Sequence, residues 1–113
     1  MQKLKKQYYF HFSMKPINLI QYRGMTKSIR KTQFSDVSVM TLKSGAEAAP
    51  DAAPNGDLIL YVIEGKAKVE IGMEQCTLTA GMVLFISERS RHRMTNIGTG
   101  ELFYMMIYTP PVY

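Results

Sequence analysis

The sequence predicts an all-β domain, a sandwich or barrel of short antiparallel strands. Three observations lead to this prediction. Runs of three to eight residues rich in β-branched and aromatic side chains recur between residues 17 and 108. Turns centred on glycine separate most of these runs, and no segment has a convincing helical period. About ten strands at this spacing are typical of a sandwich or barrel.

The N-terminal half is predicted to hold a basic extension, three strands and a long loop. Residues 1–16 are expected to be a poorly ordered extension, and residues 17–113 the domain. The expected strands are Ile17–Tyr22, Ser28–Phe34 and Val37–Leu42, with a hairpin turn at Ser35–Asp36. Two prolines, two glycines and an Asn-Gly pair predict that Ser44–Gly56 is a loop.

The C-terminal half contains the clearest strand patterns. Leu58–Ile63 is almost continuously apolar, which predicts a strand buried on both faces. Lys66–Ile71 alternates cleanly between polar and apolar residues. The remaining expected strands are Cys76–Leu78, Met82–Ile86, His92–Thr95 and Glu101–Tyr108, after which Pro110 and Pro111 stop the pairing.

Composition limits the class of protein. A chain of 113 residues forms one domain, and its longest apolar runs are too short to cross a bilayer. The single cysteine, Cys76, excludes an internal disulfide and fits a reducing compartment, so a cytoplasmic protein is expected. The net charge of +5 partly reflects lysines of the N-terminal extension, and nothing resembling a recognition helix follows them. We therefore expect neither a nucleic-acid partner nor a membrane partner.

Glycines, one histidine and one asparagine carry a resemblance to a known family. Gly45 and Gly65 have the spacing that brackets the first motif of the cupins, while Gly81, His92 and Asn96 have that of the second. From residue 17 to residue 111 the chain resembles a small single-domain cupin. The resemblance implies a jelly-roll barrel of two facing antiparallel sheets, with degenerate metal-binding motifs.

The metal ligands of the family are mostly replaced. In cupins two histidines and a glutamate of the first motif, with the histidine of the second, hold a divalent metal. By this resemblance the glutamate position is Leu58, and the histidine positions are Asp51 and Ala53, or Ala52 and Pro54 with the shorter spacing. Only His92 remains, and the second motif has Ser87 and Arg89 where the family has proline and glycine.

A divalent ion needs three or more converging ligands, so we expect no metal and no other cofactor. The alternative is a set of loop carboxylates at Glu47, Asp57 and Glu88.

The expected binding site follows from the inward positions of the family. These are Leu58, Leu60, His92 and Met94, with Asp51 and Arg89 near the mouth of the barrel. Such a site suits a small, mainly apolar molecule bearing one polar or anionic group, and does not suit a sugar. His92 is the candidate for a catalytic acid or base, the alternative being a buried neutral imidazole. Asn96 is expected to be structural, capping the turn that ends at Gly98.

Four hypotheses for the function remain open on the sequence. The first is a metal-free cupin that binds a small organic molecule as a sensor, carrier or accessory protein. The second is a metal-free isomerase or epimerase that uses His92 and a tyrosine, and the third a divergent metal-dependent oxygenase or isomerase. The fourth is a structural domain with a filled barrel. A homodimer is expected, since Leu102–Tyr108 is apolar at both parities and the barrel covers only one face.

Overall fold

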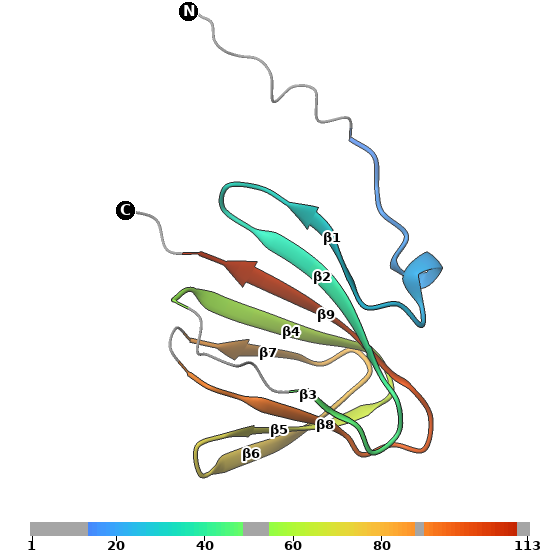
Figure 1. Ribbon diagram of the computed structural model, residues 1–113, viewed down its shortest axis with the longest axis vertical. Coiled ribbons are helices and arrows are strands. Elements are labelled where there is room, and N and C mark those ends of the chain that lie inside the picture. The colour runs from blue at the N-terminus through green and yellow to red at the C-terminus, as the bar shows by residue number, and fades with distance from the viewer. Residues whose placement is uncertain (1–13, 49–54, 88–89, 111–113) are drawn as a thin grey trace, which may run out of the picture.

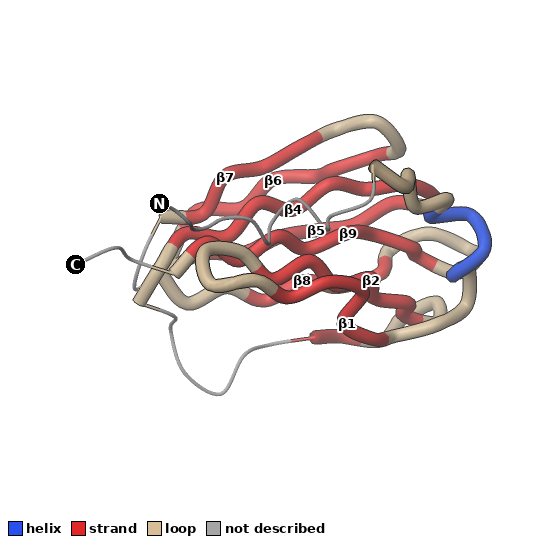
Figure 2. Tube along the Cα trace, turned by 90° about the horizontal axis from the view of Figure 1, so that it is seen from above, coloured by secondary structure: helices blue, strands red, loops and turns tan. Residues whose placement is uncertain are grey.

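Two antiparallel sheets face each other in the computed structural model, which describes residues 14–48, 55–87 and 90–110 (Figure 1). The five-stranded sheet has the order β1 (Lys27–Lys31), β2 (Asp36–Leu42), β9 (Leu102–Thr109), β4 (Asp57–Glu64) and β7 (Val83–Ile86). The four-stranded sheet has the order β3 (Glu47–Ala48), β8 (Arg93–Asn96), β5 (Lys66–Ile71) and β6 (Glu74–Thr79). Strands of both sheets run in similar directions in Figure 2. The all-β jelly-roll prediction is confirmed.

One predicted strand is wrong. The segment expected to be a strand at Ile17–Tyr22 contains instead a short 3₁₀-helix, η2 (Leu19–Tyr22). Asn18 provides the physical reason, because its side-chain oxygen accepts a hydrogen bond from the backbone N–H of Ile20 (3.1 Å) and so caps the turn. Arg23, at the end of η2, forms an ion pair with Glu64, its Nε lying 2.8 Å from Oε1. This pair fastens the N-terminal segment to the end of β4.

The described part of the loop expected at Ser44–Gly56 contains a short strand that was not predicted. This strand is β3, whose two residues pair with β8 in the register Glu47↔Thr95 and Ala48↔Met94. A two-residue strand has no periodicity that a sequence pattern could reveal, and it forms because the edge of β8 offers free backbone groups. The residues that the structure describes therefore hold nine strands, with β3 in addition to the expected ones and the strand expected at Ile17–Tyr22 missing.

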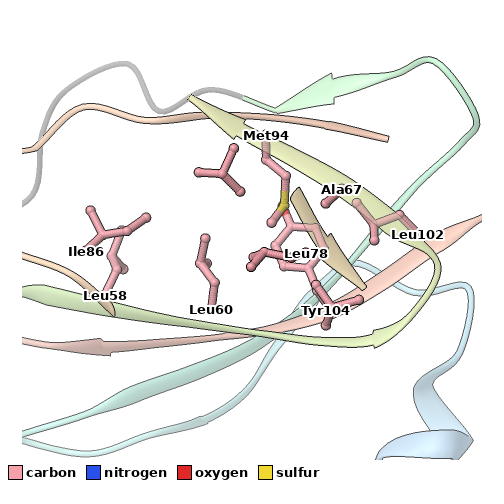
Figure 3. Packing of buried hydrophobic residues seen from close by; sticks show 10 residues of the cluster. Leu58, Leu60, Ala67, Leu78, Ile86, Met94, Leu102 and Tyr104 are labelled. Atoms are coloured by element: carbon pink, nitrogen blue, oxygen red, sulfur yellow. The ribbon is translucent and has the colours of Figure 1, made fainter. Parts of the chain in front are cut away.

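The core fills the space between the sheets (Figure 3). Leu58, Leu60 and Val62 of β4 are all buried, whereas the intervening residues of this strand are half-buried or, at Asp57, exposed. The prediction that β4 is buried on both faces is thus right for its inner face and only partly right for its outer face. The cluster comprises Leu58, Leu60, Val62, Ala67, Val69, Leu78, Ile86, Met94, Leu102 and Tyr104.

Gly65 lies at the corner where the chain passes from the five-stranded to the four-stranded sheet. It is the single residue between β4 and β5, and its φ is +101°. A Cβ at this position would lie 2.9 Å from the carbonyl oxygen of Glu101 and 3.0 Å from the Cα of Leu102. Both the conformation and the space therefore require glycine, which explains the glycine that ends the first motif.

Candidate functional site

His92 lies one residue before β8, at the end of the barrel interior. It shares the inward parity of Met94 and Asn96, which are both buried. The imidazole is half-buried, and its Nδ1 is sealed from solvent without a hydrogen-bond partner among the residues that the structure describes. Burial lowers the pKa of His92, so the ring is neutral at neutral pH. The strand predicted at His92–Thr95 is observed one residue later, at Arg93–Asn96, so His92 immediately precedes it.

The three apolar residues predicted to line the barrel are members of the core. Leu58 and Leu60 are 6% and 0% exposed, and Met94 is 1% exposed. All three lie among the packed side chains of Figure 3. They contribute packing and offer no polar group to a ligand.

Two further site residues, Asp51 and Arg89, lie outside the described residues, as does Glu88. The other loop carboxylates do not face the interior together. Glu47 lies 3.8 Å from the exposed Arg93 through its Oε1, and Asp57 is exposed at the start of β4.

The metal site of the family does not fit the donor atoms found here. Of the ligand positions suggested by the resemblance, the structure describes Leu58 and His92, and Leu58 supplies only methyl groups. Across residues 14–48, 55–87 and 90–110 no three side chains of His, Cys, Asp or Glu gather as ion ligands would. The described residues therefore do not form the metal site of the family.

Asn96 has the structural role expected for it and a further one. Its side-chain oxygen accepts from the N–H of Gly98 (2.9 Å), closing the predicted turn. Its Nδ2 donates to the carbonyl oxygens of Leu42 (2.9 Å) and Gly100 (2.8 Å). Because Leu42 ends β2 and Asn96 ends β8, this buried amide connects the two sheets. The asparagine of the second motif is therefore a structural connector.

A cleft of about 190 Å³ is lined by residues of β5 and of β6 and β7, which are edge strands of the two sheets. Its wall is apolar on the inside and polar at the rim, and it consists of Val69, Ile71, Glu74, Gln75, Cys76 and Leu84. Val69 belongs to the core, and Ile71 and Leu84 pack against it. Cys76, a free thiol, and Glu74 are exposed. The cleft is thus an extension of the core that reaches solvent.

Sequence reasoning missed this cleft, although a signal for it exists. In the hairpin of β5 and β6, Ala67, Val69 and Ile71 face inward opposite Leu78, Cys76 and Glu74. The inward positions of β6 change along the strand from apolar to polar. On an edge strand this change indicates that the interior opens there.

Two facing antiparallel sheets around one core, with glycines at the corners, define a small all-β jelly-roll domain. A family model described as the cupin domain matches residues 38–108, which is more than half of the chain. The chain therefore belongs to the cupin domain family. The recognition made from the glycine, histidine and asparagine spacing is confirmed. No curated protein matches the chain.

Solved structures show the same fold at low sequence identity. BH2720 from Bacillus halodurans is 20% identical with a TM-score of 0.79, covering 91% of this chain and 86% of that one. TT1209 from Thermus thermophilus is 18% identical with a TM-score of 0.76, covering 86% and 98%. The cupin domain of an XRE family transcriptional regulator from Enterobacter cloacae is 18% identical with a TM-score of 0.70, covering 78% and 97%. At such identities the likeness establishes the fold alone.

No helix in the described part of the chain is long and apolar enough to cross a membrane.

Proposed function

We propose that this cupin binds a small, mainly apolar organic molecule between its sheets, without a metal, as a sensor, carrier or accessory protein of the cytoplasm. The observation that carries the proposal is the cleft between β6 and β7, an apolar recess joined to the core and open to solvent. The regulator from Enterobacter cloacae supports the sensor role by analogy, since its cupin domain belongs to a transcription factor.

The volume of the cleft limits the size of the ligand. An engineered cavity of about 150 Å³ in another protein accommodates benzene, and pockets for drug-sized ligands begin at about 300 Å³. A cleft of about 190 Å³ therefore suits one ring or a short branched chain, and is too small for a nucleotide. Its apolar inner wall leaves the hydroxyl groups of a sugar without partners.

His92 lies outside the lining of this cleft, next to one of its residues. The register of β5 and β8 pairs Val69 with Met94 and Glu70 with Arg93. Continued by one residue, it places His92 beside Ile71, which lines the cleft. The buried Nδ1 has no hydrogen-bond partner in the described part of the chain. Leaving such an atom unpaired costs about 1–3 kcal/mol, and a ligand group that bonds to it recovers part of that cost.

A metal-free isomerase or epimerase is the second candidate. The lowered pKa of His92 favours it, because a neutral imidazole can accept a proton near neutral pH. Burial raises the pKa of Tyr104 to about 12, which makes that tyrosine a poor partner in proton transfer. Binding without catalysis is therefore the better-supported function.

The test is a thermal-shift screen of single-ring and short branched ligands, with sugars as a comparison class. We expect the natural protein and the control variant Arg91→Ala, changed at an exposed neighbour, to be stabilised by the same ligands. His92→Ala is expected to lose most of that stabilisation. Stabilisation mainly by sugars, or hits that His92→Ala leaves unchanged, would contradict the proposal. Elemental analysis that finds about one divalent metal per chain, lost in His92→Ala, would contradict its metal-free part.

A further inference from the structure

We infer that the ligand also carries a cationic amine, a group separate from any that bonds to His92, held by Glu74 at the rim of the cleft while the apolar part of the ligand packs beside Cys76. This inference rests on the proposed function and names the ligand class of that site: small aryl or branched alkyl amines.

The charge at the rim of the cleft indicates the charge of the ligand. The lining includes one ionised side chain among the described residues, the carboxylate of Glu74, next to the neutral amide of Gln75. No lysine, arginine or histidine of the described ranges lines the cleft. A carboxylate accepts hydrogen bonds from an ammonium group and repels an anion. The polar end of a ligand seated here is therefore a donor and a cation.

The spacing of the cleft residues along β6 limits the shape of the ligand. Glu74 lies opposite Ile71 in the β5–β6 register, and Cys76 lies opposite Val69. Glu74 and Cys76 share one face of β6 and are about 7 Å apart along the strand, two residues at about 3.3 Å each. That distance matches an aromatic ring with a one-carbon arm. An arylmethylamine can thus place its ring on Val69 and Leu84 and its nitrogen at Glu74.

The site differs from the metal position of the family. Neither Leu58 nor His92, the two described residues at suggested metal-ligand positions, lines the cleft. The sequence-based expectation was one polar or anionic group, with His92 as its partner and Arg89 near the mouth of the barrel. Among the described residues the cleft carries a negative charge, which favours a cation.

Cys76 allows a direct test, because it is the single cysteine of the chain and is exposed in the cleft. Aromatic disulfides that differ only in an aminomethyl, hydroxymethyl or carboxyl group are equilibrated with the protein and a reducing thiol. The thiolate of Cys76 attacks the fragment disulfide, forming a mixed disulfide and releasing one thiol. Intact mass then measures how much of each fragment is captured.

The matched control moves the thiol to the other face of the same strand. Cys76→Ser combined with Thr77→Cys places the only cysteine on the outer face of β6, at a position that does not line the cleft. Glu74→Gln removes the charge and keeps the shape, and the exposure of Glu74 makes this change harmless to the fold.

We expect Cys76 to capture the aminomethyl fragment about two to five times more than the carboxyl fragment, the range for an exposed ion pair. The preference should fall to about one in Glu74→Gln. The thiol at position 77 should capture all three aromatic fragments less than Cys76 does. Because the chain has a net charge of +5, non-specific attraction would favour the carboxyl fragment instead.

Two contrary outcomes are distinguishable. Equal capture of all three fragments at Cys76, still above capture at position 77, would overturn the amine and leave the apolar site of the proposed function intact. Equal capture at both positions, with no thermal shift from any ligand, would overturn the amine and the proposed function together.

Discussion

The two sheets share one core but differ on their outer faces. On the five-stranded sheet the outward residues form apolar rows across β2, β9, β4 and β7, namely Val37–Ile107–Ile59–Phe85 and Val39–Met105–Tyr61–Val83. On the four-stranded sheet the outward residues of the paired strands are polar or charged, namely Lys68, Glu70, Gln75, Thr77, Arg93 and Thr95. The four-stranded sheet therefore faces water on one side, whereas the five-stranded sheet has two faces that favour burial.

The apolar outer face is only partly covered within one chain. Val39 and Phe103, which point outward, are 0% and 1% exposed. At the other edge Phe85 is 70% exposed and Val83 49% exposed. A contiguous apolar surface of this kind marks an interaction site more often than chance exposure. The difference between the two outer faces supports the homodimer that the sequence predicts, and identifies the face that would form it.

The largest effect is expected where the two sheets are joined, at Gly65. Gly65→Ala puts a Cβ 2.9 Å from a backbone oxygen at a φ of +101°, and neither contact can relax by rotating a side chain. We expect a loss of about 3 kcal/mol in the free energy of unfolding. Urea denaturation measures it. As a control, Gly72→Ala has a positive φ but open space, and should cost about 1 kcal/mol.

The next effect concerns Asn96, the polar connector between the sheets. Asn96→Ala removes two donated bonds and one accepted bond from a buried position, leaving the carbonyls of Leu42 and Gly100 without this partner. The expected cost is about 2–3 kcal/mol in unfolding free energy. Asn96→Asp should be no better, because it loses the donors and buries a charge. Retention of full stability by Asn96→Ala would show that the connection is dispensable.

The outer faces themselves give the third prediction. If the apolar face forms the dimer, Phe85→Glu places a carboxylate in the interface and weakens the dimer at least about tenfold. Thr77→Glu makes the same charge change on the outer face of the four-stranded sheet and should leave the dimer intact. Light scattering across a concentration series measures both. A natural protein that is monomeric at micromolar concentration would contradict the prediction outright.

Sequence patterns correctly predicted the strands in which the order of polar and apolar residues shows which faces are buried. β5 alternates and has one polar outer face, as its sequence indicates, and β9 is apolar at both parities and has both faces at least half-buried. Patterns failed where a local hydrogen bond or a short pairing decides the structure. The side chain of Asn18 caps a short 3₁₀-helix in a segment whose apolar residues predicted a strand. The two residues of β3 are too few to show a polar–apolar alternation.

The candidate site was less predictable than the fold, for a geometric reason. The resemblance placed Leu58, Leu60 and Met94 on the inner face, where they lie, but spacing along the chain does not show that they fill the interior. The cleft depends on which strands end the two sheets, β6 and β7. The order of strands in each sheet is a property of the assembled barrel. It places Cys76 and Glu74 on an edge strand, where they line the cleft.

The smallest expected effect is a pH dependence at His92, on the inner side of the four-stranded sheet. Burial lowers the pKa of His92 in the folded state below the ordinary value of about 6.5 that it has in the unfolded chain. Between the two values the unfolded state binds more protons, so stability rises with pH. The stability that depends on a neutral His92 is fully present above about pH 6.5. It is lost as the pH falls toward the pKa that His92 has in the folded state.

We therefore expect the melting temperature to fall as the pH is lowered below about 6.5, and to fall less in His92→Gln, which cannot take up a proton. Arg91→Gln, at the exposed neighbour, serves as the control and should keep the natural profile. A histidine that instead gained stability on protonation would have a partner carboxylate, and its melting temperature would rise in acid. That outcome would contradict a neutral imidazole at the end of the apolar interior.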